Sequence, residues 1–226
     1  MSKPVKSPEE KVRPKRRYDS ARRRAQAGET RQRILEAAQR LFPAGGYAGT
    51  TIDGVAKDAG VAVETVYAVF GSKRALLASL VGRLVGGEES PVPLLQQSGP
   101  QAIREERDQR RQIRAFSADI SRVVERVAPI FEVIRSAAAT EPEMASLIQD
   151  MQSNRLENLT RFAGWVAASG PLRDGIDVAA AAETVWALAS PEVYRLLTGD
   201  KGWTRERYAQ WLGNSLVALL LPDAPT

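Results

Sequence analysis

The stretch from residue 50 to residue 74 constrains the fold of this chain more than any other. Thr51 is suited to cap a helix, because its hydroxyl can accept an otherwise unpaired backbone N–H. Gly60 stands where a left-handed turn residue is needed, a conformation that glycine adopts without strain. Apolar residues recur at helical spacing on both sides of that glycine: Ile52, Val55, Ala56 and Ala59, then Val61, Val66, Val69 and Phe70. Two short helices joined by a tight glycine turn are the pattern of a helix-turn-helix.

The next predicted helix begins with a capping residue followed by two cations. Ser72 can cap it, and Lys73 and Arg74 fall in its first turn. Positive charge there opposes the helix dipole and costs a few tenths to about 1 kcal/mol. A bound anion at the same helix end would reverse that effect, since helix starts bind phosphate readily. We therefore predict a phosphate contact at Lys73; two solvated surface charges are the alternative.

These residues resemble a known family. Residues 30–77 are similar to the DNA-binding domain of the TetR family of bacterial transcriptional regulators, and a weaker similarity extends to about residue 221. The matching positions are Thr51, Ile52, Val55, Ala56, Ala59, Gly60, Val61, Thr65, Tyr67, Phe70, Ser72, Lys73, Leu76 and Leu77. The resemblance implies a DNA-binding regulator of transcription with a pocket for an inducer in its second domain.

Composition excludes several kinds of chemistry. The 226 residues include no cysteine and no histidine, which removes disulfides, thiolate and histidine-based nucleophiles and nearly every zinc site. No apolar run approaches the ~20 residues of a membrane span, and the basic, proline-rich N-terminus lacks the apolar core of a secretory signal. We expect a cytoplasmic protein that is not an enzyme, uses no metal ion or cofactor, and has no membrane partner.

Positive charge is concentrated at the N-terminus. Residues 1–29 carry ten lysines and arginines against four acids, whereas residues 81–226 carry sixteen against nineteen. Because residues 1–28 have few apolar side chains to bury, we predict a disordered arm. Its candidates for contact with the DNA backbone or the minor groove are Arg22, Arg23 and Arg24. A solubilising tail is the alternative.

The rest of the chain predicts helices only, and the expected fold class is all-α. We divide the chain into the disordered basic arm (1–28), a helix-turn-helix DNA-binding domain (29–80) and a helical ligand-binding and dimerisation domain (81–226). The first helix is expected to begin near Thr30, and Pro129 is expected to break a helix or start another. The other expected boundaries are a helix end at 43–46 and helices at 72–85, 142–169, 178–189 and from Thr204 onward.

The second helix of the motif offers few polar side chains to DNA. The candidate contacts are Thr51, Ala62, Val63, Glu64, Thr65, Tyr67 and Ala68. Glu64 could accept from cytosine N4, Thr65 could contact a base edge or a phosphate, and Tyr67 a phosphate. Val63 and Ala68 could touch thymine methyl groups, but no arginine is available for the bidentate contact with guanine. Base readout should therefore be modest, with affinity supplied by phosphates and the arm.

The second domain carries candidate pocket walls. They are apolar or aromatic residues and one arginine: Phe116, Ile120, Phe131, Met151, Arg155, Phe162, Trp165 and Trp186. Plain core packing is the alternative for the apolar members. Arg155 follows Met151 by four residues and so shares its helix face, where it could orient an anionic or carbonyl ligand. A surface salt bridge is the alternative for Arg155.

Together these patterns predict a homodimeric, ligand-responsive repressor that binds a double-stranded DNA operator and is released by a small-molecule effector. The dimer is expected to form through residues 178–220, including Trp211 and Leu216, because these helices carry more apolar surface than packing on one core requires. A ligand is expected to act through the helix at 72–85. Activation in place of repression stays open, as do an architectural, weakly sequence-specific DNA binder that uses the arm and a small-molecule enzyme or carrier.

Overall fold

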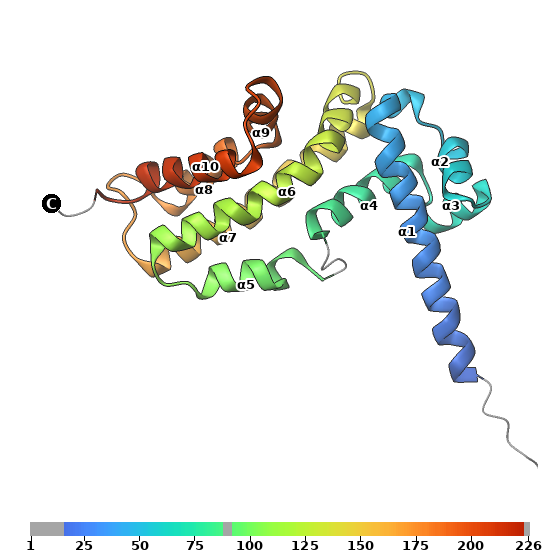
Figure 1. Ribbon diagram of the computed structural model, residues 1–226, viewed down its shortest axis with the longest axis horizontal. Helices are drawn as coiled ribbons and strands as arrows, with labels where there is room; N and C mark the ends of the chain where they lie inside the picture. The colour runs from blue at the N-terminus through green and yellow to red at the C-terminus, as the bar shows by residue number, and fades with distance from the viewer. Residues whose placement is uncertain (1–15, 88–91, 224–226) are drawn as a thin grey trace, which may run out of the picture.

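The computed structural model describes residues 16–87 and 92–223, and within those ranges it contains helices and no strand (Figure 1). The expected all-α fold class is confirmed. The elements in chain order are α1 (Arg16–Gly49), α2 (Ile52–Ala59), α3 (Val63–Phe70), α4 (Lys73–Gly86), η2 (Leu94–Gln96), α5 (Ser98–Glu105), α6 (Gln109–Ala137), α7 (Pro142–Ser169), α8 (Val178–Leu188), α9 (Pro191–Arg195), η3 (Leu196–Asp200) and α10 (Arg205–Leu220). Here η2 is a 3-10 turn and η3 a π-helical turn.

The helix-turn-helix is held by the local interactions that the sequence predicts. The Thr51 hydroxyl accepts from the backbone N–H of Gly54 at 3.0 Å. Gly60 is left-handed, with φ 65° and ψ 42°. The Ser72 hydroxyl accepts from the backbone N–H of Ala75 at 3.1 Å and caps α4. All three capping predictions are therefore confirmed.

The first helix begins earlier than expected. The sequence predicted a start near Thr30, but α1 begins at Arg16, so residues 16–28 are helical. Much of this segment is arginine, alanine and glutamine, which have high helix propensity, and the packed part of α1 provides a helix from which it extends. The first half of α1 projects from the rest of the molecule (Figure 1). The disorder expected for residues 1–15 lies outside the described residues.

The other end of α1 contains a break. Gly46 has φ 65° and ψ −177°, values that are not helical and that glycine adopts most easily. The buried Thr50 donates its hydroxyl to the Gly46 carbonyl at 2.8 Å and closes the bend. The helix end expected at 43–46 therefore corresponds to this break, although a last turn continues to Gly49.

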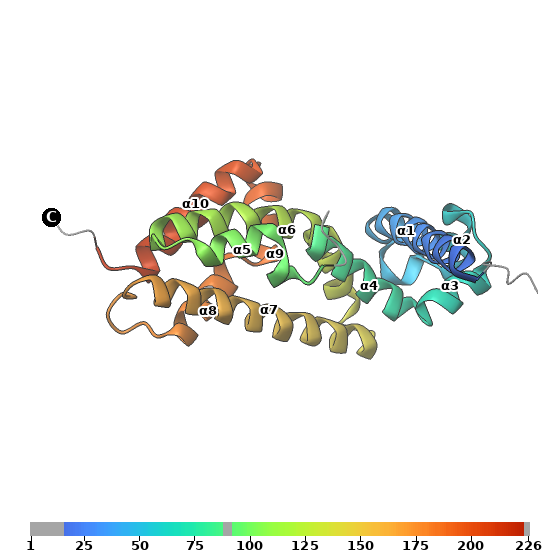
Figure 2. The same ribbon diagram turned by 90° about the horizontal axis from the view of Figure 1, so that it is seen from below.

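The C-terminal domain is arranged around α6. α10 and α7 both pack along α6, and α8 lies against α7 (Figures 1 and 2). α6 continues through Pro129, so the expected break there is wrong. Pro129 is exposed, whereas Val127, Ile130 and Ile134 are buried on the packed side of the helix. The stabilisation from apolar packing on that side therefore exceeds the cost of the backbone hydrogen bond that proline cannot make.

Two apolar clusters form the core. One joins α1–α4 to the C-terminal half of α6 and the start of α7; the other lies between α5, α6, α7, α8 and α10. Leu80 and Leu84 of α4 belong to the first cluster together with Ile130 and Ile134 of α6. The packing is thus continuous across the domain boundary expected at residue 80, and α4 cannot shift without affecting α6.

Candidate DNA-binding surface and ligand cavity

Helix α3, the second helix of the helix-turn-helix, is held by its buried face. Val66 and Phe70 are 1% and 8% exposed, and the Arg31 guanidinium of α1 lies 4.5 Å from the centre of the Phe70 ring. Tyr67, which borders this buried face, is 51% exposed. The outer face of α3 is therefore fixed in position and open to a partner.

The predicted DNA-contact residues of α3 share this open face or its edges. Four are exposed and two are half-buried: Ala62, Glu64, Tyr67 and Ala68, then Val63 and Thr65. Thr51 at the start of α2 is exposed as well, although its hydroxyl already caps the helix. The only charged side chain in this set is the carboxylate of Glu64, so the charge that attracts phosphate has to come from elsewhere.

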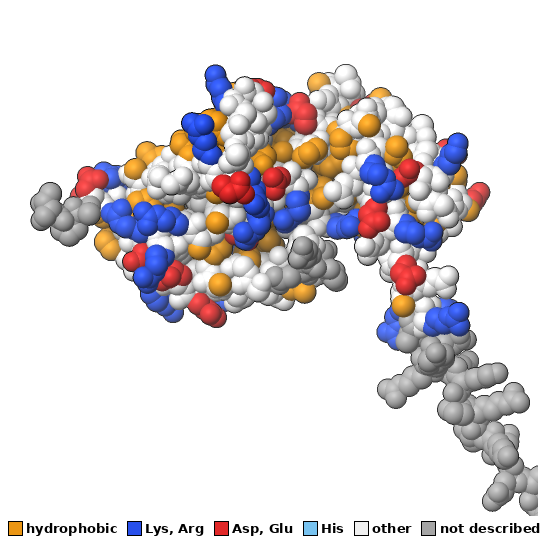
Figure 3. All heavy atoms as spheres, in the orientation of Figure 1, with side chains coloured by type: hydrophobic (Ala, Val, Ile, Leu, Met, Phe, Trp, Pro, Cys, Tyr) orange, Lys and Arg blue, Asp and Glu red, His pale blue; other side chains and the backbone are white. Residues whose placement is uncertain are grey.

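The arginines at the start of α1 supply such charge. Arg22, Arg23 and Arg24 are exposed, and Lys and Arg side chains stand on both sides of this projecting segment (Figure 3). Because they lie on a helix, where successive residues are about 100° apart, the three side chains cannot all face the same partner. Their DNA contact stays a prediction, now with one or two of them expected to reach the backbone.

Lys73 is placed differently from the prediction. Its ammonium donates to the Tyr47 carbonyl and lies 4.1 Å from the centre of the Tyr47 ring. Burial lowers the pKa of Lys73, an effect that Glu141 and Glu143 partly oppose. In this conformation Lys73 joins α4 to the end of α1. A phosphate contact stays a prediction: Lys73 is half-buried, and its ammonium has donors beyond the one that binds the Tyr47 carbonyl.

Tyr47 and Arg74 join the first domain to α7. The Tyr47 hydroxyl donates to the Glu143 carboxylate, and burial together with this carboxylate raises the pKa of Tyr47. Arg74 donates to the Glu143 carbonyl at 3.2 Å and forms an ion pair with Asp150 at 3.1 Å. Sequence reasoning missed this connection, because Tyr47 and Glu143 are 96 residues apart and no local pattern links them.

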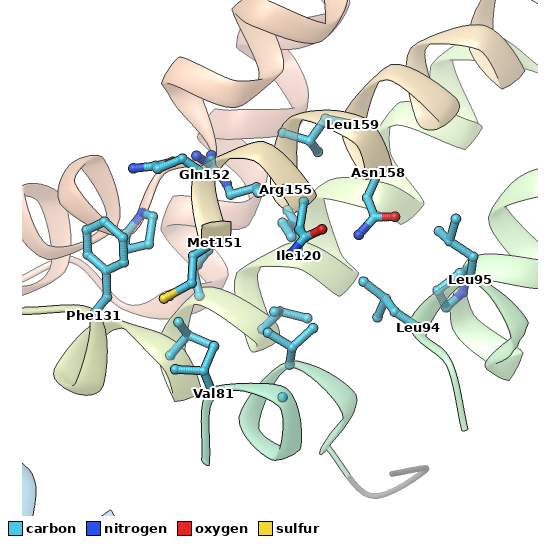
Figure 4. A pocket seen from close by; sticks show the side chains of 18 of the residues that line it. Val81, Leu94, Leu95, Ile120, Phe131, Met151, Gln152, Arg155, Asn158 and Leu159 are labelled. Atoms are coloured by element: carbon cyan, nitrogen blue, oxygen red, sulfur yellow. The ribbon is translucent and has the colours of Figure 1, made fainter. Parts of the chain in front are cut away.

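A cavity of about 460 Å³ lies between α4, α5, α6 and α7, with η2 and Pro191 at its edges. In Figure 4, Leu94 and Leu95 stand on one side of it and Phe131 on the other, with Met151 between them. The wall is mostly apolar; its polar members are Arg74, Asp119, Asp150, Gln152, Asn154, Arg155 and Asn158. The volume is in the range of sites that hold small molecules.

Seven of the eight predicted pocket residues lie in this wall: Phe116, Ile120, Phe131, Met151, Arg155, Phe162 and Trp165. Phe116 and Phe162 stack with their ring centres 3.8 Å apart. Trp186 is not part of the wall, because α8 packs on α7 away from the cavity. Its ring instead lies 5.3 Å from the Arg155 guanidinium, which donates to the Trp186 carbonyl. The alternative of a surface salt bridge for Arg155 is not observed among the described residues.

Sequence reasoning missed the walls that come from α4 and from the turn before α5. Val81 and Val85 belong to the helix at 72–85, which was expected only to transmit the effect of the ligand, and no role was predicted for Leu94 and Leu95. The available signal was that Leu94 and Leu95 are two adjacent large apolar residues within a stretch rich in glycine and proline, which indicates that they are buried against something. Asn158 of α7, whose amide is drawn among the lining side chains in Figure 4, was also missed.

The expected dimer face needs one correction. Leu216 is 0% exposed within a single chain, where it belongs to the C-terminal core, so it is not available to a partner. Leu219, on the same helix α10, is 46% exposed, and Trp211 is half-buried. A dimer through residues 178–220 therefore stays a proposal, with Leu219 in place of Leu216.

The acids of the cavity wall are paired with arginines. Asp150 bonds to Arg74 at 3.1 Å, and Asp119 bonds to Arg122 at 2.8 Å. In the ranges 16–87 and 92–223, no group of three or more acidic, histidine or cysteine side chains is placed to hold a metal ion. Across the same ranges, no helix is both long and apolar enough to cross a membrane.

Known proteins were compared with both the sequence and the fold. The family model "Bacterial regulatory proteins, tetR family" matches residues 34–80, which cover most of the helix-turn-helix domain. The HTH-type transcriptional repressor BepR of Brucella suis biovar 1 (strain 1330) is 26% identical over 197 residues, which are 80% of this chain and 87% of BepR.

Two solved structures share the fold. FadR from Bacillus subtilis in complex with stearoyl-CoA has a TM-score of 0.66 at 20% identity, covering 83% of this chain and 97% of FadR. The SmeT–triclosan complex has a TM-score of 0.66 at 21% identity, covering 86% of this chain and 93% of SmeT. At these identities the likeness establishes the fold alone.

Proposed function

We propose that this chain, a member of the TetR family of bacterial transcriptional regulators, is a repressor that binds operator DNA as a homodimer and is released by a small molecule. The relative BepR is a transcriptional repressor, and FadR and SmeT were each solved with a small molecule. We propose that this chain has both properties, repression of transcription and binding of a small molecule. It assigns the DNA contact to α3 and the first part of α1, and the ligand to the cavity.

One observation supports the ligand response: α4 lines the cavity and also directly follows α3, the helix that is predicted to contact DNA. Ala78, Val81 and Val85 of α4 line the cavity, and only Gly71 and Ser72 separate α4 from α3. Packed interiors do not deform continuously, so a ligand that needs space displaces α4 as a unit. Movement of α4 then moves α3.

The polar contacts of α7 provide a second connection. Asp150 belongs to the cavity wall and also holds Arg74, while Glu143, two turns earlier, holds Tyr47. A ligand that shifts α7 would therefore act on the end of α1 and the start of α4 together. Couplings of this kind are typically about 1–3 kcal/mol, or roughly 5- to 150-fold in affinity.

The DNA part of the proposal is tested by finding the operator. Genomic fragments that bind the purified protein are sequenced, and affinity for the recovered site is compared with affinity for a scrambled duplex at one stated salt concentration. We expect the operator to bind about a thousandfold more tightly, the lower end of the usual range, because base readout by α3 is expected to be modest. Equal affinities would favour the architectural DNA binder, a reading in which the cavity has no role.

The ligand part is tested by filling the cavity. Ile120→Trp adds a large side chain to the wall, whereas Met151→Leu conserves volume and serves as the matched control. A compound that releases the wild-type protein from its operator should release the control variant but not Ile120→Trp, although all three proteins bind DNA. Release of Ile120→Trp at the wild-type concentration would place the effector outside this cavity.

A further inference from the structure

Arg155 is the one charged side chain in the described cavity wall that lacks an oppositely charged partner. Its guanidinium donates to the Trp186 carbonyl, and its Nη1 is buried without a hydrogen-bond partner. The other charged members of the wall form ion pairs: Arg74 with Asp150, and Asp119 with Arg122. The wall therefore carries one positive charge that the described side chains do not neutralise.

The surroundings of Arg155 offset only part of that charge. Trp186 lies in the last turn of α8, and a helix C-terminus carries about half a negative charge. The Trp186 ring, 5.3 Å from the guanidinium, adds a cation–π contact. Burial nevertheless lowers the pKa of Arg155 to about 10, against a weaker opposing effect of Glu192. A buried cation without a counter-ion is costly, and a bound anion would relieve that cost.

We infer that the effector is an amphipathic anion whose carboxylate binds Arg155 and whose apolar body fills the cavity. This inference rests on the proposed ligand response. Arg155 lines the cavity, so a carboxylate there would supply the missing negative charge. Its Nη1 faces protein in this conformation, and the guanidinium would turn from Trp186 toward the cavity to pair with the carboxylate. Gln152, one turn earlier on α7, lines the same wall and offers an amide beside the headgroup (Figure 4).

The rest of the cavity suits the apolar body of such a ligand. The stacked rings of Phe116 and Phe162 form one part of the wall, and Leu94 and Leu95 form another. Their burial against a ligand would stabilise the complex by about 25 cal/mol for each Å² of apolar surface removed from water. Affinity would then come mainly from the apolar wall, and selection of the headgroup from Arg155.

Three probes with the same chain test the headgroup: dodecanoate, dodecanol and dodecyltrimethylammonium, each used below its micellar concentration. Their affinities for the full-length protein are measured by calorimetry. We expect dodecanoate to bind roughly ten- to a hundredfold more tightly than dodecanol, as a hydrogen bond to a charged group allows, and the ammonium to bind most weakly.

Variants of α7 assign the preference to one side chain. Arg155→Met keeps an apolar stem and should bind dodecanoate and dodecanol alike, whereas Arg155→Lys should retain part of the preference. Arg161→Gln removes an exposed charge from the same helix and should leave the wild-type ratio unchanged. Thermal unfolding of each variant verifies that it is folded.

The outcomes separate this inference from the proposed function. Equal or tighter binding of dodecanol, a carboxylate preference that survives Arg155→Met, or no binding of any probe would each overturn the inference. Operator release by an uncharged compound that needs the cavity would do the same while leaving the ligand response intact. Arg155-dependent binding of dodecanoate without any release of operator DNA would support the headgroup assignment and contradict the proposed function.

Discussion

The helix-turn-helix and the cavity are built from different kinds of contact. The first is closed by residues a few positions apart, as in the cap from Thr51 to Gly54 and the left-handed turn at Gly60. The cavity wall runs from Arg74 to Pro191 in sequence and takes side chains from five helices and one turn. A local motif keeps its shape when distant parts change, whereas a distributed cavity changes with any helix that lines it.

The two regions also differ in how tightly they are packed. Leu76 and Leu77 in the first are wholly enclosed by protein, while Ile120 and Met151 in the second keep one side toward the cavity. Substitution in the first region should therefore change the free energy of unfolding, and substitution in the second should change ligand affinity before stability.

The largest effect is expected in the core behind the cavity. Leu216→Arg would place a charge where no part of the side chain is exposed, and we expect a loss of more than about 4 kcal/mol, enough to unfold the protein. Leu219→Arg, on the exposed side of α10, should leave the fold intact and dissociate the proposed dimer. Circular dichroism and sedimentation distinguish the two; a folded monomer for Leu216→Arg would contradict the burial of this side chain in its own core.

The next effect compares the packing of the two regions. Leu76→Ala should lower the free energy of unfolding by about 2–5 kcal/mol, because it leaves a hole in a closed core. Met151→Ala should cost less, about 1 kcal/mol, because the side chain is only half-buried and faces the cavity. Urea denaturation measures both. Equal losses would mean that the cavity wall is packed as tightly as the helix-turn-helix core.

A smaller effect concerns the basic start of α1. Replacing Arg22, Arg23 and Arg24 by glutamine should lower the slope of log affinity against log salt by about 0.9 for each phosphate that is no longer neutralised, and hence by roughly 0.9–1.8 if one or two of these side chains face the DNA. The weakening should appear on operator and scrambled duplexes alike. An unchanged slope would mean that this segment does not touch DNA, and an effect on the operator alone would mean that it reads bases.

The smallest effect tests the connection between the regions. Tyr47→Phe removes the hydroxyl that bonds to Glu143 and should cost about 0.5–1.5 kcal/mol of stability, while also weakening operator release by ligand. Tyr67→Phe, at an exposed tyrosine of α3, is the matched control and should cost almost no stability. It is a control for stability alone, because Tyr67 is itself a predicted DNA contact. If Tyr47→Phe is released by ligand as the wild type is, α4 alone carries the coupling.

Sequence reasoning succeeded where the physical cause is local. Caps at Thr51 and Ser72, the turn at Gly60 and the helix that opens at Pro142 follow from neighbouring residues, and the structure confirms all of them. Apolar spacing also identified most of the wall residues, since side chains on one helix face point the same way.

Apart from the early start of α1, the errors share one cause, which is tertiary packing that no local pattern records. Pro129 fails to break α6 because the opposite face of that helix is buried along its length. Leu216 was assigned to the dimer interface, although it is buried in the core of its own chain. Trp186 was assigned to the cavity wall, although it contacts Arg155 on the side of α7 where α8 packs. The contact between Tyr47 and Glu143 was not anticipated for the same reason.

The central claim is that the cavity and the DNA-binding surface are thermodynamically coupled, and ligand binding with and without operator tests it most directly. A compound that binds the cavity, chosen because Ile120→Trp abolishes its binding, is titrated into the free protein and into the operator complex. Linkage requires the operator to weaken ligand binding by the same factor by which the ligand weakens operator binding, here about 5- to 150-fold. Equal ligand affinity in both titrations would contradict the coupling, because a ligand that does not distinguish the two states cannot shift the equilibrium between them.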